Sequence, residues 1–169
     1  MVKPLVVFLI LTCLSMLLNT QAKSTIEQPQ LLKSLEIQNP QKTPNACSYT
    51  VTIKTSCSST SFTRDKISIS FGDAYGYQVY APRIDDPSSR TFERCSTDTF
   101  QIAGPCMYGK ICYIYLLRVG SDGWKPDSVT ITAGRNYKPV KFNYNAFVPY
   151  GVWYGFNLCP RNDLTISAV

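Results

Sequence analysis

Short stretches in which apolar and polar residues alternate recur along residues 47–158, and this feature constrains the fold most. Successive side chains of a strand point to opposite faces, so the alternation predicts half-buried β-strands. The pattern marks strands near 49–53, 67–71, 100–102, 129–133, 140–144 and 152–158. Turn-forming Gly, Asp, Asn, Pro and Ser lie between them. We therefore predict an all-β fold, an antiparallel β-sandwich of seven or eight short strands.

Residues 110–120, KICYIYLLRVG, break the alternation because both sets of positions are apolar. A strand that is covered on both faces, or that is central in a sandwich, has this composition. We expect this segment to be such a strand.

The first 22 residues resemble a secretory signal peptide. Lys3 precedes an apolar run at 5–18, and small residues follow at 20–22. The run is short for a membrane span, although a retained signal anchor is the alternative. Cleavage would leave 147 residues, enough for one domain. We expect a flexible polar leader at 23–46, with a hint of one helical turn near Leu31 and Leu32, a sandwich at 47–160 and a loose tail at 161–169.

Without the first 22 residues the chain has 16 basic and 11 acidic residues, a net charge of +5. The basic residues are scattered, whereas nucleic-acid binding calls for a concentrated basic stripe. We therefore expect no nucleic-acid partner. A weak attraction to acidic surfaces such as anionic lipids remains open.

Six cysteines remain once Cys13 is removed with the signal, and an even number in a secreted chain predicts disulfides. Fifteen pairings are possible. Cys106 and Cys112 flank a five-residue turn, and Cys47 and Cys159 lie at the first and last strands. Our hypothesis joins each of these pairs and leaves Cys57 with Cys95.

The motif FERCSTDTF at 92–100 places Cys95 between charged residues, as in a reactive-thiol site. A nucleophilic cysteine needs a base or a cation, and the chain has no histidine. In a strand the adjacent Arg94 would point to the other face. We interpret Cys95 as a structural cysteine.

Several carboxylates are candidates for catalysts or calcium ligands. A hydrolase that acts on sugars needs two carboxylates that face each other across a cleft. The candidates are Glu93, Asp98, Asp122, Asp127 and the pair Asp85 and Asp86. Most lie beside turn residues, where Asp caps the backbone, so no catalytic residue is assigned and no enzyme is expected. Asp65, Asp73 and Asp122, near strand ends, are weak calcium candidates; no other cofactor is expected.

Three tyrosines lie in the loop-like stretch DAYGYQVYAP, namely Tyr75, Tyr77 and Tyr80. Exposed loop aromatics suit a membrane interface or a protein or sugar partner. Trp124 follows a Ser-Asp-Gly turn and is either a rim residue or a core plug. We take Tyr75, Tyr77 and Trp124 as candidates for a partner-binding or membrane-binding loop.

Several of these segments together resemble a plant PLAT/LH2 domain, most closely that of the embryo-specific secreted proteins of seed plants. The resemblance rests on CSYTVTIKT (47–55), SFTRDKISISFGD (61–73), FERCSTDTF (92–100) and the Pro-Cys…Cys, Ser-Asp-Gly and Trp features of 104–131. The departures are Cys95 where glycine is usual, Pro126 inside a strand segment, and a missing Ala-Gly-Thr before Asp65.

The resemblance implies a C2-like sandwich of two four-stranded sheets whose loops meet lipid or protein partners. It implies a secreted, monomeric, non-enzymatic binding module with a role in seed or embryo development. The alternatives are a secreted hydrolase or inhibitor that uses loop carboxylates, and a structural seed or cell-wall protein stabilised by three disulfides.

Overall fold

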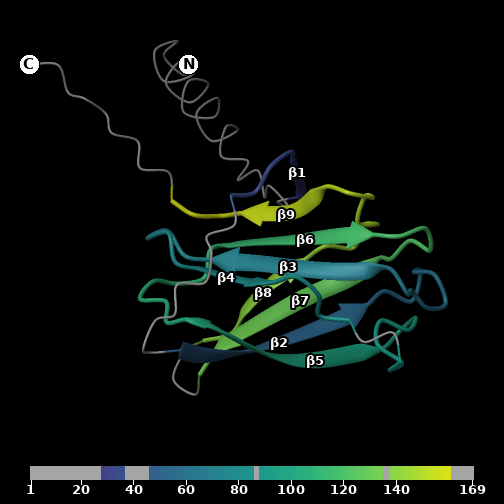
Figure 1. The fold of residues 1–169 in the computed structure, drawn as a ribbon, viewed down its shortest axis with the longest axis horizontal. Coiled ribbons are helices and arrows are strands. Elements are labelled where there is room, and N and C mark those ends of the chain that lie inside the picture. The colour runs from purple at the N-terminus through teal and green to yellow at the C-terminus, as the bar shows by residue number, and fades with distance from the viewer. Residues whose placement is uncertain (1–27, 37–45, 86–87, 135–137, 161–169) are drawn as a thin grey trace, which may run out of the picture.

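The computed structural model describes residues 28–36, 46–85, 88–134 and 138–160, which form two packed antiparallel sheets (Figure 1). The first sheet has the strand order β1-β9-β6-β3-β4 and the second the order β5-β2-β7-β8. The predicted all-β sandwich is thus confirmed. Within the described ranges no helix is long and apolar enough to cross a membrane. The strands are β1 (Gln30–Leu32), β2 (Ala46–Thr55), β3 (Lys66–Gly72), β4 (Gln78–Ala81), β5 (Thr97–Pro105), β6 (Tyr113–Val119), β7 (Pro126–Ala133), β8 (Val140–Asn143) and β9 (Trp153–Asn157).

The alternating segments all form strands, and β6 lies centrally between β9 and β3 as predicted. Two strands were not predicted. β4 occupies part of the stretch expected to be a loop, and Tyr80 lies in it. β1 lies in the predicted leader, where a helical turn was expected at Leu31, and its pairing with β9 gives the first sheet five strands. The predicted signal peptide and tail, and most of the leader, lie outside the described residues.

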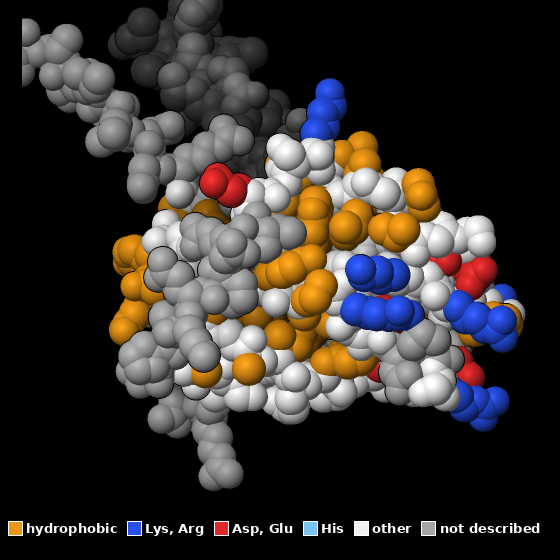
Figure 2. Space-filling view, viewed as in Figure 1, with side chains coloured by type: hydrophobic (Ala, Val, Ile, Leu, Met, Phe, Trp, Pro, Cys, Tyr) orange, Lys and Arg blue, Asp and Glu red, His pale blue; other side chains and the backbone are white. Residues whose placement is uncertain are grey.

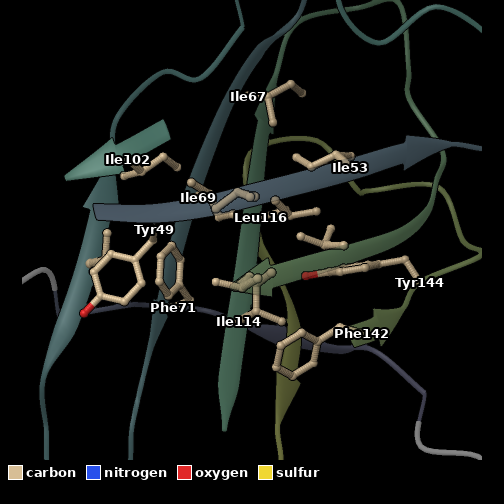
Figure 3. Packing of buried hydrophobic residues seen from close by; sticks show 14 of the residues in the cluster. Tyr49, Ile53, Ile67, Ile69, Phe71, Ile102, Ile114, Leu116, Phe142 and Tyr144 are labelled. Atoms are coloured by element: carbon tan, nitrogen blue, oxygen red, sulfur yellow. The ribbon is translucent and has the colours of Figure 1, made fainter. Parts of the chain in front are cut away.

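The core lies between the two sheets and is built from the apolar set of each strand (Figure 3). β2 contributes Tyr49, Val51 and Ile53, and β3 contributes the opposing Ile67, Ile69 and Phe71. The ring of Tyr49 meets the ring of Phe71 edge-on at 5.4 Å. Burial of these side chains supplies the main favourable term of folding.

The outer face of the first sheet is also covered, although the middle of β3 places the small polar residues Ser68 and Ser70 there. Tyr80 of β4 and Trp153 of β9 lie three strands apart, about 14 Å at ordinary strand spacing. Their ring centroids are only 6.1 Å apart. The rings therefore lean toward each other across β3 and β6, which explains why Ser68 and Ser70 are buried. The Ser68 hydroxyl donates to the Pro82 carbonyl at 2.6 Å, whereas the Ser70 hydroxyl has no partner.

The difference between these two serines predicts opposite effects on stability. Ser70→Ala removes a buried hydroxyl without a hydrogen bond, so the free energy of unfolding should stay equal or rise by up to about 1 kcal/mol. Ser68→Ala is the matched control. It removes the hydrogen bond to the Pro82 carbonyl and should lower the free energy of unfolding by about 1 kcal/mol. Urea denaturation of the oxidised proteins measures both. Equal losses in the two variants would contradict the assignment.

Candidate functional site

The antiparallel strands deliver loops to two ends of the sandwich (Figure 1). At one end β3 finishes and β6 begins; we call it the tyrosine end, and it comprises the turn 73–77 and the loop 106–112. At the other end β3 begins and β6 finishes; we call it the aspartate end, and it contains Asp65 and Asp122. Figure 2 shows hydrophobic side chains gathered at the left end of the molecule, where β3 finishes in Figure 1.

The turn 73–77 is organised by the buried carboxylate of Asp73. Its Oδ1 accepts hydrogen bonds from the backbone N–H groups of Tyr75 and Tyr77 at 3.0 and 3.1 Å. Its Oδ2 accepts one from the N–H of Gly109 at 3.0 Å, which ties the turn to the neighbouring loop. Gly76 has φ of 90°, a backbone conformation that favours glycine. The turn is therefore fixed by a side chain that is itself buried.

The loop 106–112 is held at both ends by disulfides, Cys47–Cys106 and Cys112–Cys159. The expected pairings of Cys106 with Cys112 and of Cys47 with Cys159 are wrong. The loop leaves β5 in the second sheet and enters β6 in the first. Cys106 therefore lies beside the start of β2, while Cys112 lies beside the residues that follow β9.

Two aromatic side chains of the tyrosine end are almost fully in solvent. Tyr75 is 75% exposed and Tyr108 is 77% exposed, while Tyr77 is partly exposed. The rings of Tyr77 and Tyr108 meet edge-on at 5.3 Å. The prediction that Tyr75 and Tyr77 are exposed loop aromatics is confirmed, and Tyr108 joins them. Tyr108 was missed, although it lies beside glycine in a short segment between two cysteines, a context like that of Tyr75.

Two adjoining cavities flank this loop, with volumes of about 490 and 430 Å³. Both are lined by Gly109, Lys110, Ile111 and Val140. Lys138 lines the larger one, and Tyr75 and Leu158 line the smaller. Neither lysine was singled out in the sequence, because scattered basic residues carry no pattern. The tyrosine end thus combines exposed aromatic rings, apolar hollows and two ammonium groups.

Trp124 does not belong to this surface, so its assignment to a partner-binding loop is wrong. It lies at the aspartate end and is 0% exposed. Its indole N–H donates to Thr55 Oγ1 at 3.1 Å, and its ring packs on Phe92 with centroids 4.8 Å apart. The residue is a core plug, the other reading that its sequence context allowed.

Asp65 is the centre of the aspartate end. It forms a buried ion pair with Arg118, and its oxygens accept hydrogen bonds from the N–H groups of Asp122 and Gly123. Burial by itself raises the pKa of Asp65. The hydrogen bonds from Asp122, Arg118 and Gly123 and the charge of Arg118 more than offset this effect, so the pKa lies below its ordinary value. Arg118 also donates to the carbonyls of Val148 and Gly120.

The structure does not bring the three calcium candidates together. Asp65 and Asp73 lie at opposite ends of β3, roughly 25 Å apart at the ordinary rise of a strand. The oxygens of both already accept backbone N–H bonds, and Asp122 accepts one from Arg64 at 2.8 Å. Among the described residues, no cluster of three or more potential metal-ligating side chains occurs. These aspartates organise loops.

Cys95 belongs to a turn at the aspartate end and pairs with Cys57, as predicted. Phe92 and Cys95 have φ of 62° and 63°, in the left-handed region that favours glycine. This explains why glycine fits position 95. Asp98 stabilises the turn by accepting hydrogen bonds from the Phe92 N–H and the Ser96 hydroxyl, both at 2.9 Å.

The other candidate carboxylates also have local partners. Glu93 pairs with Arg90, Asp127 with Lys54, and Asp85 with Arg83. Asp86 lies outside the described residues. The two cavities at the tyrosine end and two further ones elsewhere have no Asp or Glu in their lining. This arrangement offers no acid and base facing each other across one of these hollows.

Solved structures with the same architecture define the fold class as a PLAT-like sandwich. The coral 8R-lipoxygenase structure matches with a TM-score of 0.54 and 21% identity, over 65% of this chain and 17% of the other. The alpha toxin from Clostridium absonum matches with a TM-score of 0.54 and 22% identity, over 70% of this chain and 33% of the other. At these identities the likeness shows the fold alone.

The sequence comparison identifies the family. The model of Embryo-specific protein 3 (ATS3) matches residues 34–159, so the chain belongs to the ATS3 family. Embryo-specific protein ATS3A of Arabidopsis thaliana is 68% identical over 114 residues, 68% of this chain and 63% of the relative. ATS3B of the same plant is 54% identical over 145 residues, 85% of this chain and 75% of the relative. The matched region thus spans less than two thirds of ATS3A.

Loss of the Asp65 carboxylate should destabilise the protein in a pH-dependent way. Asp65→Asn leaves Arg118 buried without its partner, so the free energy of unfolding at neutral pH should fall by about 3 kcal/mol or more. The folded pKa lies below the ordinary value of 3.8. The contribution of the carboxylate is therefore fully present above that value and is lost as the pH falls through the folded pKa.

Urea denaturation of the wild type and of Asp65→Asn at several pH values measures this difference, which should shrink on acidification below about pH 4. Asp127→Asn is the control, since its surface pair with Lys54 should contribute less than about 1 kcal/mol. A difference for Asp65→Asn that stayed constant down to pH ~2 would contradict the role of its ionised form.

The left-handed backbone at position 95 predicts which residue best replaces its cysteine. Cys57→Ser with Cys95→Gly and Cys57→Ser with Cys95→Ser both lose one disulfide. The glycine variant should be more stable by about 1 kcal/mol, because the Cβ of serine makes the left-handed conformation energetically unfavourable. Thermal or urea unfolding compares the two variants directly. Equal stabilities would mean that the disulfide alone holds this conformation.

Proposed function

We propose that this chain is a secreted, non-catalytic binding module that contacts a membrane surface through its tyrosine end. The observation that carries the proposal is the pair of tyrosines, Tyr75 and Tyr108, held about three-quarters exposed on fixed loops. These rings lie beside two apolar hollows, and exposed apolar surface that gathers in one region marks a candidate interaction site.

The chemistry of the tyrosine end suits a lipid–water interface. A tyrosine ring is apolar and its hydroxyl is polar, so it is favoured where hydrocarbon meets water. Lys110 and Lys138 lie beside the rings and would be attracted to anionic headgroups. Since the loops are already ordered, contact with a membrane would cost little conformational entropy.

Secretion is supported by the three disulfides, which persist in oxidising compartments. Membership in a family named for embryo-specific proteins supports a role in seed or embryo development. The structure of the coral 8R-lipoxygenase is described with calcium activation via a C2-like domain. In this chain Asp65, Asp73 and Asp122 are used by loop backbone, so membrane contact is expected without calcium.

Two other functions are supported less well. A protein partner would meet the same exposed tyrosines, but the two lysines beside them add a reason to favour an acidic lipid surface. A hydrolase or inhibitor based on loop carboxylates is disfavoured because the described candidates are engaged in turns and ion pairs.

Liposome co-sedimentation tests the proposal. The disulfide-bonded protein from Lys23 onward is mixed with neutral or anionic vesicles, with and without calcium. Binding should be stronger to anionic vesicles, fall with added salt and need no calcium. Tyr75→Ser with Tyr77→Ser should weaken partitioning roughly tenfold.

Tyr150→Ser is the matched control, because Tyr150 is a tyrosine 66% exposed in the loop between β8 and β9, at the aspartate end. Its partitioning should equal that of the wild type. Failure to bind any vesicle would overturn the membrane proposal and favour a protein partner, which affinity capture from developing seeds would then seek.

A further inference from the structure

The larger cavity at the tyrosine end opens onto the hydrophobic core. Met107, Ile111 and Ile131, which line it, all belong to the buried core cluster. Ala133 and Val140 add apolar surface at the ends of β7 and β8. A hollow at this edge of the sandwich can therefore take an apolar chain while the core behind it stays packed.

The mouth of this cavity is positively charged. Lys110 and Lys138 both line it and both are exposed. Among the described residues, no Asp or Glu lines this cavity or its neighbour, and neither lysine forms an ion pair. Two ammonium groups over an apolar floor are complementary to a molecule with an anionic head and an apolar tail.

The volume of the two cavities is also suitable for a small-molecule ligand. The two cavities measure about 490 and 430 Å³ and share the lining residues Lys110 and Ile111. Ligand-binding pockets commonly measure about 300–1,000 Å³. The loop between them is preformed, since Met107 N–H donates to the Tyr49 hydroxyl at 3.0 Å and the Gly109 N–H donates to Asp73. Because the loop is already ordered, binding of a ligand would cost little free energy for ordering the protein.

We propose that this pocket binds one molecule of a single-chain anionic amphiphile, such as a free fatty acid, with the carboxylate at Lys110 and Lys138 and the chain over Ile111 and Ile131. The proposal goes beyond membrane contact, because the pocket holds a single molecule rather than a bilayer surface. It shares Lys110 and Lys138 with the proposed membrane contact, but its apolar part is the floor of the larger cavity, whose lining does not include Tyr75 or Tyr77.

Isothermal titration calorimetry with palmitate below its critical micelle concentration tests the proposal on the disulfide-bonded protein. Palmitate should bind with a stoichiometry of one, whereas hexadecanol and hexadecylamine should bind at least about tenfold more weakly, since they lack the anionic head. Lys110→Gln with Lys138→Gln should weaken palmitate binding about tenfold or more. Lys141→Gln, which changes an exposed lysine of β8 that lines neither cavity, should leave it unchanged.

Ala133→Phe provides a second variant, which fills the apolar part of the pocket and keeps both lysines. It should abolish palmitate binding while the disulfides and the unfolding transition stay intact. No binding of palmitate to the folded wild type, equal binding of hexadecylamine, or unchanged binding by Ala133→Phe would each overturn the proposal.

The two proposals fail independently. Ala133→Phe should still sediment with anionic vesicles if the tyrosines contact the membrane. The variant that combines Tyr75→Ser and Tyr77→Ser should still bind monomeric palmitate if the pocket is correctly assigned. Loss of palmitate binding in this tyrosine variant would overturn the pocket assignment.

Discussion

The buried pair of Asp65 and Arg118 is the interaction on which one whole end of the sandwich depends. It joins the residue that precedes β3 to the penultimate residue of β6, and each partner uses its remaining hydrogen-bonding capacity on backbone of a separate loop. The carboxylate organises the turn that leads to Trp124, and the guanidinium holds the carbonyl of Val148. A pair so placed orders three segments that are far apart in the sequence, at residues 65, 118–123 and 148, which compensates for part of the cost of removing two charges from water.

The same device recurs at the tyrosine end with a different consequence. Asp73 is also buried, and its carboxylate oxygens also accept hydrogen bonds from N–H groups of two separate segments. Its neighbours Tyr75 and Tyr77, however, face solvent, whereas Asp65 pairs with the buried Arg118 and holds the turn that precedes the buried Trp124. Similar local chemistry thus supports two different ends. At the tyrosine end it holds exposed rings beside hollows lined by two lysines, which is the combination that the proposed binding surface uses.

The sequence revealed the strands because alternation reports directly on which face is buried, and each long alternating segment became a strand. The pattern did not predict β4, because four residues are too few to show a clear alternation of apolar and polar positions. It did not predict β1, because that strand forms by pairing with β9, which is distant in the sequence. Two disulfides were mispaired because spacing along the chain does not tell to which sheet each cysteine belongs. Asp65 and Trp124 were misjudged for a related reason: a turn context is the same whether the side chain points outward or inward.

The disulfide pattern divides the chain into two parts that are joined by the peptide backbone but, among the described cysteines, by no disulfide. Cys47–Cys106 and Cys57–Cys95 lie before residue 107, and Cys112–Cys159 lies after residue 111, so among the described cysteines no bridge crosses the segment between them. Yet both sheets interleave strands from the two parts, through β1 with β9, β3 with β6 and β2 with β7. A protease that cut the exposed loop at Tyr108 would therefore leave two complementary fragments held together by main-chain hydrogen bonds and a shared core, and the loop of the tyrosine end would be divided between them.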